Sequence, residues 1–239
     1  PIKSRNTTSV SLVGTDGGNN KIQYDPFLIQ LIRVVDSSNN EYCLEAVTPS
    51  TSISSLSKKQ FDESGSPITS LGRLMETLNV SHLSQLSHMI RDNKDGKPTS
   101  PTWIQVYREL VEWAILYDIV KNKEFGSDTL IVFDGLLRSK AFSKDLFNRF
   151  IHELEEAVKE QKNRRRKIYI VGLAKHSKVL TRYRLAMALE KVLYTDYSAY
   201  LEIDRELEEK SYIWSEYARD DDRTVEGKEI NKFVGGKMF

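Results

Sequence analysis

Cysteine is almost absent from this sequence of 239 residues, in which Cys43 stands alone. A single cysteine excludes an intrachain disulfide framework and a zinc site made of several thiolates. Long apolar runs are absent as well, since none approaches the roughly 20 residues that a membrane-spanning helix needs. The first residues also lack the charged and then apolar pattern of a secretion signal. We therefore expect a cytoplasmic protein that is not inserted in a membrane.

An excess of charge of one sign is also missing, because 35 Lys and Arg residues face 34 Asp and Glu residues. A nucleic-acid partner would therefore have to meet a local basic patch. The sequence contains no Gly-x-x-x-x-Gly-Lys phosphate loop, no Gly-x-Gly-x-x-Gly dinucleotide fingerprint and no Gly-x-Ser-x-Gly elbow. These absences argue against ATP hydrolysis by this chain.

The opening third of the sequence predicts three antiparallel strands. Residues 9–15 alternate polar and apolar side chains and run into Asp16-Gly17-Gly18-Asn19-Asn20, which is strong turn chemistry. Residues 27–35 and 41–47 are two further strand-like runs joined by a short polar connection. We expect these strands to form a meander, with an aspartate at the end of the first.

Residues 48–100 interrupt this pattern. The first part, residues 48–68, is rich in Ser, Thr, Gly and Pro and predicts a long loop, while residues 71–78 and 83–90 carry apolar side chains at helical spacing. We interpret residues 48–100 as a helical and loop insertion in a single domain spanning residues 1–239. The last five residues read like the approach to another strand, so we expect this domain to be truncated at its C-terminus.

From residue 100 onward, helical and strand patterns alternate. The predicted helices cover 103–120, 143–160, 179–192 and 206–218, and the predicted strands cover 128–133, 167–173 and 199–203. A meander followed by alternating helices and strands predicts an α/β fold with a mixed sheet flanked by helices.

Two aspartates, Asp16 and Asp134, each follow a strand pattern and precede a glycine. Taken alone, each is more often a turn residue, because Asp-Gly is a common turn dipeptide. Together they indicate more, since functional groups gather at the carboxyl ends of strands in open α/β sheets. Neighbouring carboxylates repel each other unless a cation neutralises them, and Mg²⁺ or Mn²⁺ suits such oxygen ligands. This order of elements and aspartates is that of the ribonuclease-H-like fold.

A third carboxylate is expected from the helix between the two aspartate-bearing strands. Glu109 and Glu112 lie three residues apart on it and therefore share a face. Glu112 is slightly favoured because it lies nearer the strand that carries Asp134. Both glutamates could instead be surface residues that pair with nearby cations such as Arg108.

Basic side chains are predicted at the same edge of the sheet. Lys175, His176 and Lys178 follow the strand at 167–173, and Arg138 and Arg182 could widen the patch. A phosphate backbone would fit such a surface. A solvated loop with routine charges explains these residues equally well.

The residues described so far resemble the NurA nuclease family. The resemblance rests on Val13 to Gly18, Arg108 to Trp113, Asp128 to Arg138, Tyr169 to Lys178 and Trp214 to Arg219. It covers nearly the whole chain apart from residues 48–100, and the segment around Lys175 is the most specific part.

The resemblance implies a ribonuclease-H-like, manganese-dependent nuclease that acts on DNA ends. It further implies a homodimer that works with a HerA-type hexameric ATPase, in DNA repair or in defence against phage. By position, Asp16, Glu112 or Glu109, and Asp134 correspond to the family's acidic residues. Family members also use a Tyr and a His near the C-terminus, and no such His follows His176 here.

Two other functions remain open at the level of the sequence. The same fold could serve as a non-catalytic dimeric adaptor on a DNA-translocating motor. A plain nucleic-acid-binding module would bind DNA in a salt-dependent way without cleaving it, although the near-zero net charge argues mildly against it.

Overall fold

The structure is a computed structural model that describes residues 11–24, 27–37, 39–135, 137, 139, 141–173, 178–192, 196–197, 199–204 and 206–207. The chain divides into two compact units. One consists of residues 8–173, and the other of residues 1–7 together with 174–239. Each unit is described by itself below.

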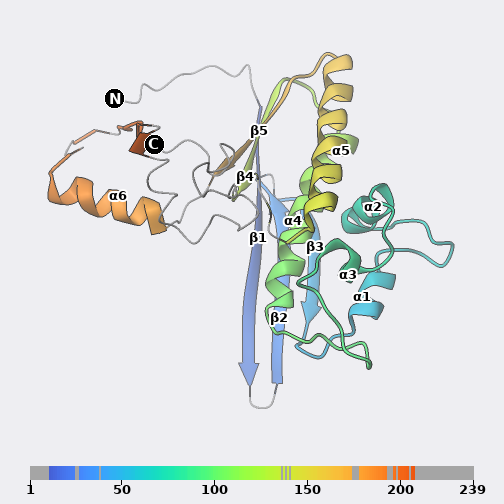
Figure 1. Cartoon of the computed structure of the whole chain (residues 1–239). Coiled ribbons are helices and arrows are strands. Elements are labelled where there is room, and N and C mark those ends of the chain that lie inside the picture. Colours follow the sequence, from blue (N-terminus) through green and yellow to red (C-terminus); the bar gives the residue numbers. More distant parts are fainter. Residues whose placement is uncertain are drawn as a thin grey trace, which may run out of the picture. The chain divides into compact units, whose positions relative to one another are not determined.

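The unit of residues 8–173 is built on a five-stranded sheet with the order β3-β2-β1-β4-β5 (Figure 1). Its strands are β1 (Ser11–Tyr24), β2 (Phe27–Asp36), β3 (Glu41–Val47), β4 (Thr129–Asp134) and β5 (Ile168–Leu173). β1, β2 and β3 pair antiparallel, and β4 runs parallel to both β1 and β5. The predicted meander and the mixed α/β sheet are confirmed.

The predicted end of the first strand is wrong. β1 continues through the glycines and asparagines after Asp16 as far as Tyr24, and it stays paired with β2 along this length. Its ladder with β4, in contrast, ends at the pair Thr15 and Phe133. The long antiparallel partner supplies the hydrogen bonds that override the local turn preference. Asp16 therefore lies inside β1, at the point where β4 leaves it.

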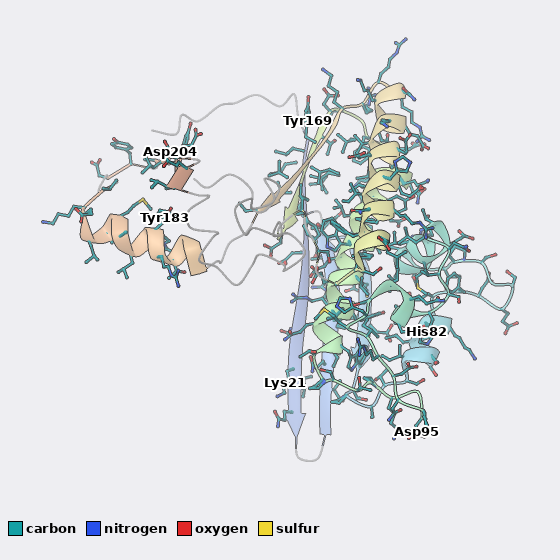
Figure 2. The ribbon with its side chains drawn as sticks, in the orientation of Figure 1. Lys21, His82, Asp95, Tyr169, Tyr183 and Asp204 are labelled. Carbon is teal, nitrogen blue, oxygen red and sulfur yellow. The ribbon has the colours of Figure 1, made fainter. Side chains whose placement is uncertain are left out.

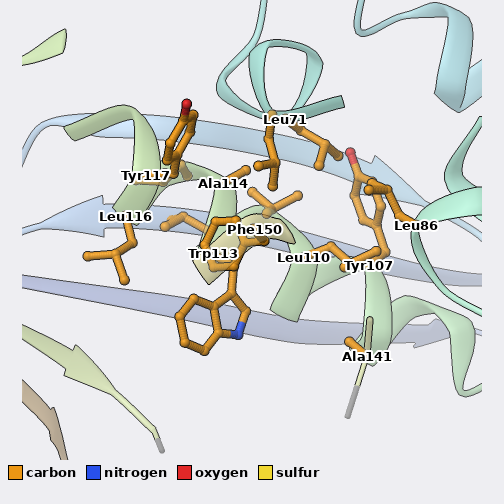
Figure 3. Close-up of a cluster of buried hydrophobic side chains, with 14 of the residues drawn as sticks. Leu71, Leu86, Tyr107, Leu110, Trp113, Ala114, Leu116, Tyr117, Ala141 and Phe150 are labelled. Atoms are coloured by element: carbon orange, nitrogen blue, oxygen red, sulfur yellow. The ribbon is translucent and has the colours of Figure 1, made fainter. Parts of the chain in front are cut away.

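The core lies between the sheet and the helices α4 (Trp103–Asn122) and α5 (Lys144–Asn163), which pack side by side (Figure 1). α4 is buried over most of its surface, as its apolar composition predicts. Trp113 of α4 stands at the centre of an aromatic cluster with Phe133, Phe147 and Phe150, and Figure 3 shows it among its buried neighbours. Burial of these large rings stabilises the contact of α4 with β4 and α5.

The insertion at residues 48–100 is more ordered than its composition predicts. The predicted loop at 48–68 contains helix α1 (Ile53–Lys58), whose residues Ile53 and Leu56 are buried. Helix α2 (Ser70–Thr77) agrees with the prediction, whereas α3 (Leu83–Leu86) is shorter than predicted. His82, which is labelled in Figure 2, caps the start of α3, where its side chain accepts from the Ser84 backbone N–H. Burial of Ile53 and Leu56, together with the Ser52 side chain that accepts from the Ser55 N–H, favours a helix in a sequence rich in turn formers.

Two turns of the insertion repeat one hydrogen-bond pattern. The Asp62 carboxylate accepts from the backbone N–H groups of Ser64 and Ser66, and the Asn93 side chain accepts from those of Asp95 and Lys97. In each turn a glycine with positive φ follows three residues after the acceptor, namely Gly65 (84°) and Gly96 (71°). Local side-chain bonds of this kind fix a turn without a core.

The described part of the other unit contains α6 (Lys178–Leu189), which agrees with the predicted helix. The Tyr183 hydroxyl donates a hydrogen bond to the Leu207 carbonyl (Figure 2). The strand predicted at 199–203 is wrong, because these residues form neither helix nor strand. Most of the helix predicted at 206–218 lies outside the described residues. Within the described part of the chain, no helix is both long and apolar enough to span a membrane.

Candidate carboxylate site

Asp16 and Asp134 lie next to each other across the parallel pair of β1 and β4. Each is the residue that follows the last pair of this ladder, Thr15 and Phe133. Adjacent strands are spaced by about 5 Å, so the backbones that carry the two aspartates are direct neighbours. The structure thus brings together the two residues that the sequence placed at a common edge.

Glu112 of α4 reaches the same place from the helix side. A Cβ atom added to Gly17 would lie 2.0 Å from Glu112 Oε1, so the carboxyl group occupies the space that a side chain at position 17 would need. The absence of a side chain at Gly17 is therefore a condition for this approach. It places the Glu112 carboxyl against the residue that directly follows Asp16.

The charge around Glu112 is unfavourable for a carboxylate. The pKa of Glu112 is raised from 4.5 to about 7, mainly by burial; Arg108 acts in the opposite direction, and the negative charges of Glu109, Asp16 and Asp134 add to the rise. The Glu112 side chain is 12% exposed and its Oε1 lies 3.3 Å from Arg108 Nε. Asp16, Glu112 and Asp134 are called the acidic site below. Their negative charges disfavour the ionised form of Glu112, and the positive charge of Arg108 offsets this effect only in part.

Two buried polar atoms at the acidic site have no hydrogen-bond partner among the residues that the structure describes. They are the Thr15 hydroxyl oxygen and Arg108 Nε, which is close to Glu112 but does not meet hydrogen-bond geometry. Buried polar groups are nearly always satisfied, so such atoms mark places where the fold has not optimised stability. Thr15 directly precedes Asp16, and Arg108 Nε lies beside Glu112. Both atoms therefore adjoin residues that the sequence predicts as metal ligands.

Glu109 has a different environment from Glu112. The buried hydroxyl of Ser139, in the segment after β4, donates a hydrogen bond to Glu109 Oε1. The same hydroxyl oxygen accepts from the Ala141 backbone N–H at 3.0 Å. The two glutamates of α4 therefore differ in their contacts, although the sequence could not distinguish them: Glu112 lies at β1, and Glu109 lies at the segment that follows Asp134.

The two aspartates leave the sheet on the face opposite to Glu112. Thr15 and Phe133 are buried on the helix side, and Gly17 faces Glu112, so alternation along the strands directs Asp16 and Asp134 to the other face. Asp16 is exposed there. Among the residues that the structure describes, no group of three or more His, Cys, Asp or Glu side chains lies close enough together to hold a metal ion. The three carboxyl groups gather at one edge without forming a closed cage.

Most of the predicted phosphate-binding residues cannot be related to the acidic site. Arg138, Lys175 and His176 lie outside the described residues. Lys178 begins α6, and Arg182 is exposed on the same helix, which belongs to the other unit. The expected basic patch therefore stays a prediction.

Sequence reasoning missed three residues that shape the site. Gly17 was interpreted as a turn residue, although two glycines inside a run that pairs as a strand are a signal of close approach. Gly172 of β5 allows the segment after β4 to cross over it, since a Cβ there would lie 2.5 Å from the Gly135 carbonyl oxygen. Ser139 gave no signal, because its partner Glu109 is 30 residues away.

Comparison with known proteins adds no assignment. The chain matches no protein-family model, no curated protein and no solved structure.

Proposed function

We propose that this protein is a metal-dependent DNA nuclease of the NurA type. The observation that carries the proposal is the position of the Glu112 carboxyl, which lies against Gly17 beside Asp16 and within electrostatic reach of Asp134. Three acidic side chains from β1, α4 and β4 at one sheet edge are costly without a cation. Groups held in such unfavourable electrostatics are typical of functional sites.

The strand arrangement supports a ribonuclease-H-like core. The order β3-β2-β1-β4-β5 has three antiparallel strands followed by two parallel ones. The last of the helices between the meander and the second aspartate-bearing strand is α4, which carries Glu112. This is the sequence of elements that we associate with a ribonuclease-H-like nuclease.

The donor set of the acidic site fits a hard divalent cation such as Mn²⁺ or Mg²⁺. Carboxylate oxygens are the preferred ligands of these ions, and a cation would replace the proton that Glu112 otherwise holds near neutral pH. Asp16 and Asp134, on one face of the sheet, and Glu112, at the place where β4 leaves β1, are the residues that would hold it. The ion would supply polarisation of the phosphodiester and a more acidic water molecule.

The protein's own groups set up this chemistry in separate ways. Gly17 admits the Glu112 carboxyl to β1, and Arg108 holds it from the adjacent turn of α4. Asp16 is exposed and therefore open to a phosphodiester approaching the sheet. Lys175, His176, Lys178, Arg138 and Arg182 would contact the DNA backbone by charge.

The wider role follows from the same family resemblance. The protein would act in the cytoplasm as a homodimer that processes DNA ends together with a HerA-type hexameric ATPase. Such a complex serves DNA repair or defence against phage.

The direct test measures cleavage of end-labelled DNA by the full chain with Mn²⁺ or Mg²⁺. We expect Asp134→Ala, Asp16→Asn and Glu112→Gln each to abolish cleavage without unfolding the protein. Glu76→Gln is a matched control, because Glu76 is exposed on α2 and far along the chain from the site. Undiminished cleavage by Asp134→Ala would refute the assignment.

A non-catalytic dimeric adaptor on a DNA-translocating motor is the second candidate. It is favoured by the lack, within the described residues, of a preformed group of three metal-binding side chains. The adaptor hypothesis predicts full binding to the motor ring and no cleavage under any metal condition. The nuclease hypothesis predicts cleavage that depends on both Asp134 and the metal.

A further inference from the structure

Residues 162–167 join α5 to β5 and are called the basic turn below. Five of these six residues are Lys or Arg and none is acidic, whereas the whole chain has a formal net charge of +1. Lys162, Arg164, Arg165 and Lys167 are exposed, and their side chains form no ion pair with any residue that the structure describes. The basic turn is therefore a local excess of positive charge that the protein itself does not neutralise.

The backbone of the basic turn is fixed at the end of α5. The Arg165 N–H donates to the Lys162 carbonyl and the Arg166 N–H donates to the Gln161 carbonyl, both at 2.9 Å, which is a Schellman motif. Arg165 has a φ of 63°, a left-handed conformation that glycine usually supplies at this position. An arginine is less stable there than a glycine, which points to a use for its side chain.

Two further hydrogen bonds attach the basic turn to the loop between α4 and β4. Arg166 Nε donates to the Phe125 carbonyl at 2.7 Å, and the Lys167 N–H donates to Asp128 Oδ1 at 2.9 Å. The exposed cations thus project from a preorganised segment, so less conformational entropy is lost when they bind a ligand. The dipole of α5 favours cations in its last turn, but Lys167 lies beyond that range.

An exposed aromatic ring lies next to the basic turn in the chain. Tyr169, which is labelled in Figure 2, is 49% exposed. It follows Lys167 by two residues, so the two side chains project from the same face of the sheet. Cations beside an exposed ring suit single-stranded nucleic acid, because the charges bind phosphates and an unpaired base stacks on the ring.

The basic turn and the acidic site lie at opposite ends of β4. The Lys167 carbonyl accepts from the N–H of Thr129, which begins β4, and Asp134 ends this strand. At about 3.3 Å per residue, the two ends of β4 are about 17 Å apart. Alternation along β4 and β5 directs Asp134 and Tyr169 to the same face, because Leu130 pairs with Tyr169 and is an even number of residues from Asp134. A strand of nucleic acid lying along this face would reach both places.

We propose that the basic turn and Tyr169 form a contact surface for single-stranded nucleic acid, in which Arg164, Arg165 and Lys167 bind phosphates and the Tyr169 ring stacks on a base. The proposal deepens the proposed nuclease function, on which its role in cleavage rests, by adding a substrate contact outside the acidic site. Binding at this surface needs no metal.

The first test measures binding of fluorescein-labelled oligothymidine to the full chain in EDTA by fluorescence anisotropy. The triple variant Arg164→Gln, Arg165→Gln, Lys167→Gln should bind about 10- to 100-fold more weakly than the unmodified chain. The slope of log affinity against log salt concentration should fall by about 2, because each phosphate contact on a single strand contributes about 0.7.

A matched control removes the same charge from the insertion. Lys58→Gln, Lys94→Gln and Lys97→Gln together change three exposed lysines and should leave oligothymidine binding within about twofold of the unmodified chain. Equal binding by the two triple variants would overturn the proposal.

Vesicles that contain phosphatidylserine test a different polyanion. The unmodified chain should bind oligothymidine in preference to these vesicles. If it binds the vesicles and not oligothymidine, and the triple variant of the basic turn loses vesicle binding, the turn is a lipid-binding surface and the proposal is wrong.

The role of Tyr169 is tested separately from the charges. Tyr169→Ala should weaken oligothymidine binding by about tenfold with an unchanged salt slope, whereas Tyr169→Phe keeps the ring and should bind within about twofold of the unmodified chain. Binding of a DNA duplex should not respond to Tyr169→Ala, because its bases are already stacked. Equal oligothymidine affinities of the alanine and phenylalanine variants would refute the stacking contact.

Arg165→Gly separates binding from stability. Glycine adopts the left-handed conformation more readily, so the melting temperature should rise while oligothymidine affinity falls by about fourfold. A higher melting temperature with unchanged affinity would show that Arg165 does not contact the nucleic acid.

Cleavage of oligothymidine with Mn²⁺ distinguishes this proposal from the nuclease function. The triple variant of the basic turn should raise KM and keep kcat, because the turn is distant from the acidic site. If the unmodified chain binds through these residues but cleaves nothing, the proposed function fails and the surface stands. If it cleaves, and the triple variant binds and cleaves equally well, the surface fails and the nuclease function stands.

Discussion

The insertion at residues 48–100 and the acidic site treat their charged groups in opposite ways. Helix α2 of the insertion is held to α4 by Asp118, whose carboxylate oxygens accept hydrogen bonds from the Arg73 guanidinium at 2.6 Å and from the Ser70 hydroxyl at 2.8 Å. At the acidic site, Glu112 is buried among like charges, and Nε of its ion-pair partner Arg108 has no hydrogen-bond partner within the described part of the chain. The polar groups between the insertion and α4 are paired and stabilise the fold, whereas those of the acidic site are incompletely paired, as is typical of a site that binds a ligand.

The largest expected effect breaks the anchor of the insertion. Asp118→Ala removes the acceptor of Arg73, Ser70 and Asn122 and leaves the buried Ser70 hydroxyl without it. We expect a loss of about 3 kcal/mol or more in the free energy of unfolding, measured with urea. Glu76→Ala, on an exposed position of α2, should change it little. A small loss in the free energy of unfolding of Asp118→Ala would show that the paired polar groups of the insertion do not contribute more to stability than those of the acidic site.

The second expected effect is a gain rather than a loss in the free energy of unfolding, and it concerns the acidic site. Because the pKa of Glu112 is raised in the folded protein to about 7, the folded state holds this proton between pH 4.5 and 7 while the unfolded chain releases it. Stability should therefore fall as pH rises through this window, by about 2 to 3 kcal/mol. Glu112→Gln should remove this part of the pH dependence and stabilise the metal-free protein at pH 8, as measured by urea unfolding. An unchanged pH profile would contradict the electrostatic account.

A smaller effect on stability is expected from Gly17→Ala. The new Cβ would displace the Glu112 carboxyl, whose flexible end can rotate away, so the cost should be about 1 to 2 kcal/mol. Mn²⁺ should raise the melting temperature of the unmodified chain but not that of Gly17→Ala. Gly18→Ala is a matched control, because the nearest atom to its Cβ would be 4.0 Å away. Similar metal responses in the two variants would show that Gly17 has no special role.

The smallest effect belongs to the turns of the insertion. Asn93→Ala removes the acceptor of the Asp95 and Lys97 N–H groups, which are open to water. We expect a loss of about 0.5 to 1 kcal/mol in urea unfolding and no change in metal binding. A change in Mn²⁺ affinity would mean that the insertion and the acidic site are coupled.

The sequence predicted most of the elements from periodicity, because their apolar positions match the faces that are buried. α4 and β4 agree with the prediction almost to the residue. The failures lie where partners far along the chain decide. β1 runs through a turn-like sequence because β2 pairs with it, and α1 forms because Ile53 and Leu56 are buried by the rest of the insertion.

The candidate site was predicted in its residue types but not in its arrangement. Asp16 and Asp134 were predicted at one edge because parallel strands end together. The ladder of β1 and β4 does end beside them, although β1 itself continues to Tyr24. The difference between Glu109 and Glu112 could not be predicted, since residues three apart on a helix share a face. Only the contacts with Ser139 and Gly17 separate them.

The amino-acid sequence alone determined the strand and helix periods, the mixed α/β class and the acidic residues that could meet, because these depend on local patterns of apolar and charged side chains. The tertiary structure decided which glutamate faces Gly17, where β4 leaves β1 and which polar groups stay unsatisfied. Those outcomes depend on packing between segments that are distant along the chain, and no local pattern records such distances.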